Sequence, residues 1–288
     1  MGLARWAAVV LIAAALAGPA AAELKLTAES DVPADTHQYL IHSAILDRDL
    51  IVRVAAPARP PAEGGKVAVF YTLDATTSFD LVASIARNLQ RAGKMAPAYV
   101  VAVGYPGDRQ TVSMLRTYDY LHVAIGSPPQ GGNGARFEQA LNQEIRPFVE
   151  GRLPIDPAKA VLGGHSFGGL FTAHVATEHP DSFTAYLVSS GSLWVGDEQP
   201  VKAAVELAKS HKAHGRRIYI SVGGEEPESM TATSARYYAA LSAPNSGFQA
   251  ERQLWPGETH GSVFAWALLK GLPFVLPPDP AQTARAGD

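Results

Sequence analysis

Gly163-Gly164-His165-Ser166-Phe167-Gly168-Gly169 is the stretch of sequence that decides the fold. It contains the pattern G-x-S-x-G, preceded by a short apolar segment, Ala160–Gly163, and followed by an apolar segment, Phe167–Ala176. A serine held on a sharp turn from strand to helix needs small neighbours, because a side chain at the glycine positions would clash with the adjoining backbone. The stretch therefore predicts a strand–turn–helix unit with Ser166 at its turn.

The segments around this unit alternate between strand and helix patterns. The predicted strands are His37–Ile45, Asp49–Ala56, Val67–Leu73, Ala98–Val103, Ala160–Gly163, Thr184–Ser189, Arg217–Val222 and Gln249–Leu254. The predicted helices are 79–89, 137–148, Phe167–Ala176, Val201–Lys212, Ala235–Leu241 and Ser262–Leu272. Such alternation predicts one α/β domain with a mostly parallel central sheet, an antiparallel hairpin at its start and helices on both faces.

Two parts of the chain carry no regular pattern. The segment Gly104–Gly134 is rich in Gly, Pro and polar residues, and we expect a long loop there, of a length that usually carries function. Residues 273–288 contain four prolines and almost no periodicity, so we expect a loosely held C-terminal tail after a domain that covers residues 23–272.

The first 22 residues have the pattern of a secretory signal peptide. Arg5 precedes an apolar run from Trp6 to Ala17, and the small residues Ala20-Ala21-Ala22 follow a Gly-Pro break. The run is shorter than the roughly 20 residues that a membrane span needs. We therefore expect cleavage before Glu23, export to a periplasm or to the medium, and no membrane span in the mature chain.

Composition excludes several classes of protein. The chain has 288 residues, of which 47% are apolar, a share that is ordinary for a folded domain. Its formal net charge of −3 argues against nucleic-acid binding, which needs an excess of Lys and Arg. The absence of Cys excludes disulfides, thiolate metal sites and a cysteine nucleophile.

A serine nucleophile needs a base and an acid that orients it, and in this architecture the chain order is Ser, acid, His. Among the histidines after the Phe167 helix and its exit, His211 and His214 end a Lys-rich segment, whereas His260 follows the last predicted strand and enters a helix. Position therefore favours His260 as the base. Glu225 and Glu226 both follow the strand Arg217–Val222, and the spacing favours Glu226, with Glu225 as the alternative.

Several further segments carry a family resemblance. They are Tyr71-Thr72-Leu73-Asp74, Gly104-Tyr105, Arg116-Thr117-Tyr118-Asp119-Tyr120, Gly131-Gly132, Gly164–Gly169, Ser190-Gly191-Ser192-Leu193-Trp194 and Glu258-Thr259-His260-Gly261-Ser262. In this order they resemble an esterase branch of the α/β-hydrolases, and within it the periplasmic esterases that open trilactone siderophores of the enterobactin type. The resemblance covers about 200 residues, and its Arg-Thr-Tyr-Asp-Tyr and Ser-Leu-Trp pieces are more specific than the serine motif.

The resemblance implies an α/β-hydrolase fold with Ser166 as nucleophile and His260 as base. It also implies an oxyanion hole formed by the backbone N–H groups of Phe167 and Thr76. The chain departs from the family at two positions: Ala75 stands where the family usually has glycine, next to the second oxyanion donor, and Gly191 stands where it usually has proline, in the pocket wall.

Two further side chains are candidates for binding substrate. Arg116 resembles a family arginine near the active site and could bind a carboxylate or catecholate oxygen; the alternative is an ion pair with Asp119 or Asp74. Trp194 could stack on a flat acyl group, or could be a plain core or rim aromatic.

The sequence thus predicts a serine ester hydrolase that acts on a small-molecule ester, without a metal or other cofactor. Two alternatives stay open. One is a non-catalytic ligand-binding relative, and the other is an acyltransferase or thioesterase that uses the same three residues.

Overall fold

The computed structural model of the protein describes residues 25–32, 35–61, 63–209 and 213–278. The predicted signal peptide (residues 1–22) lies outside the described residues, as do His211 and the end of the predicted tail. In the described part of the chain, no helix is both long and apolar enough to cross a membrane.

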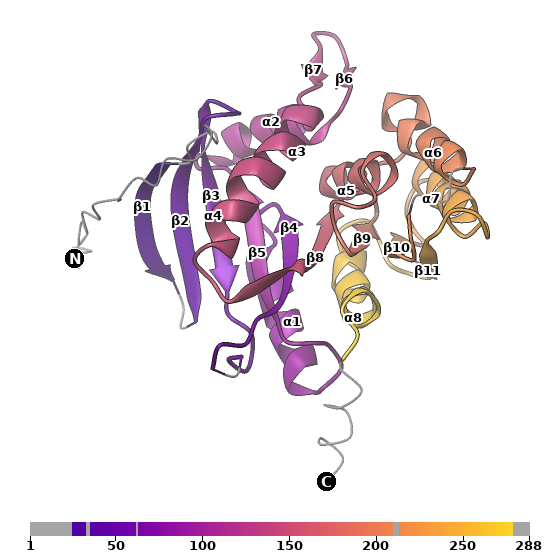
Figure 1. The fold of residues 1–288 in the computed structure, drawn as a ribbon. Coiled ribbons are helices and arrows are strands. Elements are labelled where there is room, and N and C mark those ends of the chain that lie inside the picture. Colours follow the sequence, from indigo (N-terminus) through magenta and orange to yellow (C-terminus); the bar gives the residue numbers. More distant parts are fainter. Residues whose placement is uncertain (1–24, 33–34, 62, 210–212, 279–288) are drawn as a thin grey trace.

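A nine-stranded sheet forms the centre of the molecule, with the order β1-β2-β3-β5-β4-β8-β9-β10-β11 (Figure 1). β1, β2, β3 and β5 pair antiparallel, and every pair from β5 onward is parallel. The strands are β1 (Lys25–Val32), β2 (Thr36–Ser43), β3 (Arg48–Ala55), β4 (Val67–Leu73), β5 (Ala98–Gly104), β8 (Ile155–His165), β9 (Ala185–Ser189), β10 (Arg217–Gly223) and β11 (Gln249–Trp255). The predicted sheet, with its antiparallel start, is confirmed.

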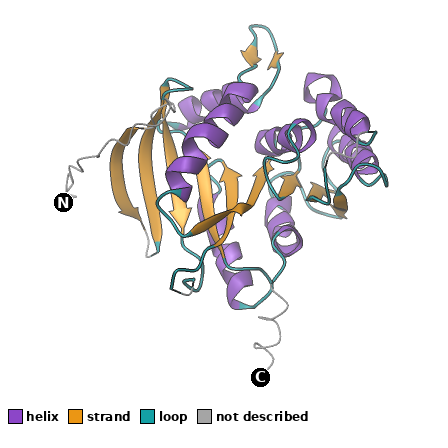
Figure 2. Ribbon diagram, in the orientation of Figure 1, coloured by secondary structure: helices purple, strands orange, loops and turns teal. Residues whose placement is uncertain are grey.

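Helices cover both faces of the sheet (Figure 2). α1 (Phe79–Arg91) and α8 (Val263–Val275) pack on one face. The other face carries α2 (Arg109–Tyr120), α3 (Gly134–Ala140), α4 (Arg146–Glu150), α5 (Phe167–Glu178), α6 (Val195–Leu207) and α7 (Glu228–Leu241), with the π-helical segment Leu141–Ile145 between α3 and α4.

The strand β4 shows how the two faces are separated. Val69, Tyr71 and Leu73 belong to the apolar cluster on the α5 side, whereas Ala68 and Phe70 belong to the cluster under α1 and α8. Successive side chains of a strand point to opposite faces, so a strand buried on both sides reads as a continuous apolar run. This is the run that predicted the strand, with the bounds observed.

The predicted loop Gly104–Gly134 was wrong over much of its length. It contains α2 and a short hairpin of β6 (Ala124–Ile125) and β7 (Gln130–Gly131), which projects from the body of the molecule in Figure 2. The side chain of Asp108 caps α2 by accepting the Thr111 N–H at 2.8 Å. Only the last two residues of α2 are fully buried, so the helix lacks the apolar stripe on which a sequence-based prediction depends.

The predicted strand Ala160–Gly163 and the predicted helices Val201–Lys212 and Ala235–Leu241 correspond to β8, α6 and α7, which begin earlier than predicted. Both ends of the described domain also differ from the prediction. β1 was not predicted, because the segment Lys25–Val32 is mostly polar. At the other end, α8 continues to Val275, three residues into the predicted tail. Val275 and Leu276 are buried, and the Leu276 carbonyl accepts the Ala96 N–H at 3.0 Å. The packed domain therefore extends at least to residue 276.

Candidate active site

Ser166 lies at the turn between β8 and α5, with φ 60° and ψ −120°. A positive φ is costly for a residue with a side chain, so the surrounding structure must hold this turn in place. A Cβ on Gly164 would lie 2.4 Å from the Gly168 backbone, and one on Gly169 would lie 2.8 Å from the Ser189 carbonyl. The flanking glycines are therefore required by close backbone approach, as the sequence predicted.

His260 and Glu226, in the loops that follow the neighbouring strands β11 and β10, are joined by a hydrogen bond. His260 Nδ1 and Glu226 Oε2 are 2.7 Å apart, and the Glu226 side chain is fully buried. Its other oxygen accepts the Gly223 N–H at 2.8 Å and the Ser190 hydroxyl at 2.5 Å. Glu225, the alternative acid, is exposed. Of the two carboxylates, Glu226 is the one that binds His260.

Burial alone would raise the pKa of Glu226, but the hydrogen bonds from His260, Ser190 and Gly223 outweigh it and lower the pKa below its usual value. The side chain is therefore ionised at neutral pH and can only accept hydrogen bonds. His260 must then carry a proton on Nδ1, which leaves Nε2 free to accept one.

His165 brings this pair next to the serine turn. It stands inside the serine motif, but the motif predicted no role for its side chain. Its ring lies 4.6 Å from the His260 ring and 4.9 Å from that of Phe264, and its Nδ1 is 3.0 Å from Ser189 Oγ. Burial, and then the nearby charge of His260, lower the pKa of His165 to about 3. His165 is thus a neutral side chain whose ring contacts that of His260. In the chain it directly precedes Ser166.

Two backbone N–H groups near Ser166 have no hydrogen-bond partner among the described residues. Phe167 begins α5, and its N–H precedes the first hydrogen bond of that helix. The second group is in the turn that follows β4. There the Ala75 N–H donates to the Val103 carbonyl, and the N–H groups of Thr77 and Ser78 donate to the Asp74 carbonyl. The Thr76 N–H donates no hydrogen bond to a described residue. These are the two groups predicted as oxyanion donors, and Thr76 lines a hollow of about 590 Å³ that also contacts His165.

Arg116 makes the ion pair with Asp74 that was one of its two alternatives. Its Nε and Nη2 lie 2.7 and 3.0 Å from the Asp74 carboxylate oxygens, and Nη2 also donates to the His165 carbonyl at 3.1 Å. Asp119 is instead bound by Arg48 and Asn133. Arg116 therefore ties the Thr76 turn to the Ser166 turn, although it also lines the hollow of about 590 Å³. Its binding of substrate stays a prediction.

Trp194 lies on the other side of the serine turn. Ser192 N–H donates to the Ser166 carbonyl at 3.2 Å, which fixes the segment that carries Trp194. The indole N–H donates to Met230 Sδ at 3.2 Å, and the side chain is 47% exposed. Trp194 is thus a rim residue with one exposed face rather than a core residue. Stacking on an acyl group stays a prediction.

The sequence of the chain matches the family described as "Putative esterase" over residues 43–264. The chain belongs to this esterase family. Among curated proteins, it is 26% identical over 252 residues to the ferri-bacillibactin esterase BesA of Bacillus subtilis. The aligned region covers 81% of this chain and 86% of that protein. It is also 26% identical over 223 residues to a siderophore enterobactin esterase of Emericella nidulans, with 61% of this chain and 71% of that protein covered.

Among solved structures, the esterase is similar to the BES protein of Bacillus cereus, with a TM-score of 0.75 and 25% identity over 88% of this chain and 98% of that one. The structure of siderophore hydrolase EstB from Aspergillus nidulans superposes with a TM-score of 0.74 at 20% identity, covering 87% and 97% of the two chains. Together with the sheet order, these similarities confirm the predicted α/β-hydrolase fold.

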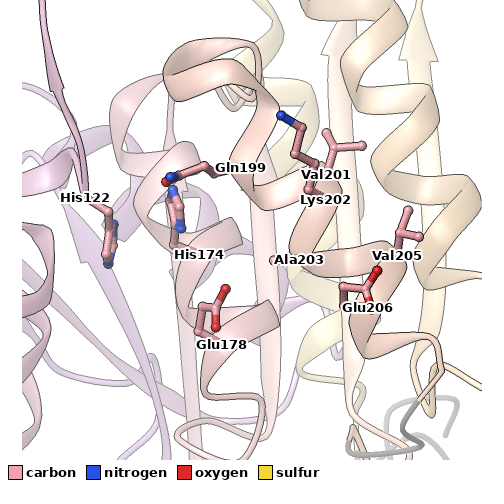
Figure 3. Close-up of a pocket in the computed structure, with 9 residues that line it drawn as sticks. All are labelled: His122, His174, Glu178, Gln199, Val201, Lys202, Ala203, Val205 and Glu206. Atoms are coloured by element: carbon pink, nitrogen blue, oxygen red, sulfur yellow. The ribbon is translucent and has the colours of Figure 1, made fainter.

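A second group of histidines in the esterase lies away from Ser166, in a hollow of about 740 Å³ beside α5 and α6 (Figure 3). The rings of His122 and His174 stack there at 4.1 Å. Burial lowers the pKa of His122 to about 4 and that of His174 to about 3. Within the described ranges, no group of three or more His, Asp or Glu side chains could hold a metal ion, here or elsewhere.

Proposed function

We propose that the protein is an exported serine esterase that hydrolyses siderophore-type carboxylic esters with Ser166, His260 and Glu226. The observation that carries the proposal is the 2.7 Å hydrogen bond between His260 and a buried carboxylate, beside a serine on a strained turn. A buried acid that fixes an imidazole tautomer beside a serine is the arrangement that activates a hydroxyl for attack.

In the proposed reaction, Ser166 Oγ attacks the ester carbonyl carbon while His260 Nε2 takes the hydroxyl proton. The negative charge on the carbonyl oxygen is stabilised by the N–H groups of Phe167 and Thr76. The C–O bond to the alcohol then breaks, His260 returns the proton to the leaving alkoxide, and an acyl-serine remains. Water, deprotonated by His260, attacks this acyl group and releases the carboxylic acid and free Ser166.

Within this cycle, Glu226 keeps the proton on Nδ1 and stabilises the imidazolium that forms. Ser166 Oγ has no hydrogen-bond partner among the described residues in this conformation, so its bond to His260 would form when substrate closes the site. Catalytic hydrogen bonds are often looser without substrate than with it.

The substrate class rests on the relatives, two of which are named for bacillibactin and enterobactin. An open hollow of about 590 Å³, lined by Thr76, His165 and Arg116, is wide enough for one aromatic acyl arm of such an ester. Export to a periplasm or to the medium rests on the sequence of residues 1–22, and N-terminal sequencing of the secreted protein tests it: cleavage predicts a chain that starts at Glu23.

The direct test is hydrolysis of a p-nitrophenyl ester and of a catecholate trilactone by the wild-type protein and by Ser166→Ala. We expect the wild type to cleave the trilactone and the variant to lose activity by at least about 10³-fold, because removal of the nucleophile leaves only the oxyanion hole and binding. If the wild type binds the trilactone but cleaves neither ester, the protein is a binding relative and the proposal is wrong.

A further inference from the structure

A second hollow, of about 830 Å³, adjoins the one beside Ser166 across helix α2. Arg109 and Ser113 line both hollows, so the two hollows adjoin on either side of the ridge that these residues form. The far hollow is bounded by other α2 side chains and by Gln130 and neighbouring residues of the hairpin β6–β7, whose strand β7 contacts α2. A ligand that occupies the active site therefore has a path to the far hollow without leaving the surface.

Two large hydrophobic side chains line the far hollow and are exposed to solvent. Met114 is 62% exposed and Tyr118 43% exposed, and both line this hollow. They are four residues apart on α2 and so lie on one side of the helix, one turn from each other. A flexible thioether beside an aromatic ring is a surface suited to stacking with a flat aromatic group.

The ridge carries a positive charge. Arg109 is exposed and takes part in none of the ion pairs among the residues that the structure describes. The nearest carboxylate in sequence, Asp108, is occupied in capping α2. The guanidinium of Arg109 is therefore available for a bidentate contact with adjacent anionic oxygens, such as those of a catecholate.

The separation of the two hollows fits a substrate with more than one arm. Arg109 and Arg116 are seven residues apart on α2, which at 1.5 Å per residue is roughly 10 Å along the helix. Arg116 lies beside the Ser166 turn, so Arg109 lies farther from the reacting ester by about the length of one acyl arm of the substrate.

We propose that this second hollow, defined by Arg109, Met114, Tyr118 and Gln130, holds a non-reacting catecholate arm of a multi-armed ester while another arm is cleaved at Ser166. The proposal rests on the proposed function and adds a specificity site to it. Arg109 binds the anionic oxygens of the arm, and Met114 and Tyr118 pack on its ring. Because the arm does not touch the reacting atoms, its contacts change KM rather than kcat.

The test compares Arg109→Gln and Met114→Ser with the wild type on two esters of the same acyl group, a catecholate trilactone and a linear ester with a single catecholate arm. We expect each variant to raise KM for the trilactone by about tenfold and to leave its kcat unchanged. For the single-armed ester, Met114→Ser should leave both constants within about twofold. Arg109 also lines the hollow beside Ser166, so Arg109→Gln should raise KM for the single-armed ester, but by less than for the trilactone. Arg91→Gln, which removes an exposed arginine from the end of α1, is the matched control for charge and should change neither ester.

Equal effects on the two esters, or no change in KM for the trilactone, would overturn this inference while leaving the proposed function intact. If the wild type hydrolysed neither ester, that result would instead contradict the proposed function itself. Met114→Ser changes an exposed side chain, so its folding can be confirmed by an unchanged melting temperature.

Discussion

Two pairs of imidazoles in the described part of the chain have their rings in close contact and differ in one partner. His165 and His260 lie 4.6 Å apart at the start of α5, and His122 and His174 lie 4.1 Å apart further along the same helix. His260 is bound to the buried carboxylate of Glu226. Neither His122 nor His174 has a hydrogen bond to a carboxylate in the described ranges, and His122 Nδ1 is buried there without a partner.

The difference teaches what separates a base from a packed aromatic ring. Desolvation favours the neutral form of every buried histidine. Only a carboxylate on Nδ1 fixes the tautomer and stabilises the charged ring that forms when a proton is taken. The predictions below break or sharpen this contrast, from the largest expected effect to the smallest.

Glu226→Gln should remove the difference between the two pairs. The amide cannot stabilise imidazolium and can hold the ring in the wrong tautomer, so kcat should fall by about 10³–10⁴-fold. Steady-state hydrolysis of a p-nitrophenyl ester measures the loss. Glu225→Gln, an exposed neighbour with the same chemistry, should keep activity within about twofold. If the two variants were equally active, Glu226 would not be the orienting acid.

Arg116→Gln tests whether the site also depends on the link between its two turns. The change leaves the Asp74 carboxylate unpaired and frees the His165 carbonyl, so we expect kcat to fall by about 10- to 100-fold with little change in KM. Arg116→Lys should recover part of the loss, since it keeps the charge but not the two-pronged contact. A rise in KM at constant kcat would instead identify Arg116 as a substrate-binding residue.

Acid should destabilise the protein through the histidines that lack a carboxylate. The pKa values of His122, His165 and His174 are lowered in the folded state to about 4, 3 and 3, so between those values and about pH 6.5 the unfolded chain binds more protons. Stability should therefore be full above pH 6.5 and fall as pH decreases. Each of the three histidines contributes up to about 1.4 kcal/mol per pH unit, a tenfold change in the unfolding constant.

Urea unfolding at pH 7, 6 and 5 measures this slope. The variant His174→Gln cannot titrate at that position, so its slope should be flatter than that of the wild type by up to the contribution of one histidine. An unchanged slope in this variant would show that His174 does not titrate abnormally in the folded state.

The smallest effect is expected on activity when the second pair is lost. His174→Gln should keep kcat/KM for the trilactone within about twofold at pH 7.5, because the ring touches neither the serine turn nor its hollow. A large loss of activity in a protein with normal stability would show that the two imidazole pairs are coupled through α5.

The sequence could predict those parts of the site whose position depends on residues close to them in the chain. The glycines around Ser166 are required by close backbone approach, and a histidine after the last strand of such a sheet has few other positions to take. Spacing favoured Glu226 but left Glu225 open, and the turn that buries Glu226 against Gly223 and Ser190 decides between them.

Long-range contacts set the limit of that reasoning. Arg116 and Asp74 are 42 residues apart, and their pairing depends on how α2 crosses the sheet edge, a helix that the polar sequence of 104–134 concealed. His122 and His174 meet across 52 residues, and neither stands in a motif. The sheet was predicted better than α2 because buried strands are continuous apolar runs, whereas α2 is largely exposed.

The central claim, that Ser166 is activated by His260, is tested most directly by reaction with a serine-directed phosphonate followed by peptide mass spectrometry. We predict one adduct per chain, on the peptide that contains Ser166, with none in Ser166→Ala and labelling at least about 10²-fold slower in His260→Ala. An unlabelled wild type, or a His260→Ala variant labelled as fast as the wild type, would contradict the account.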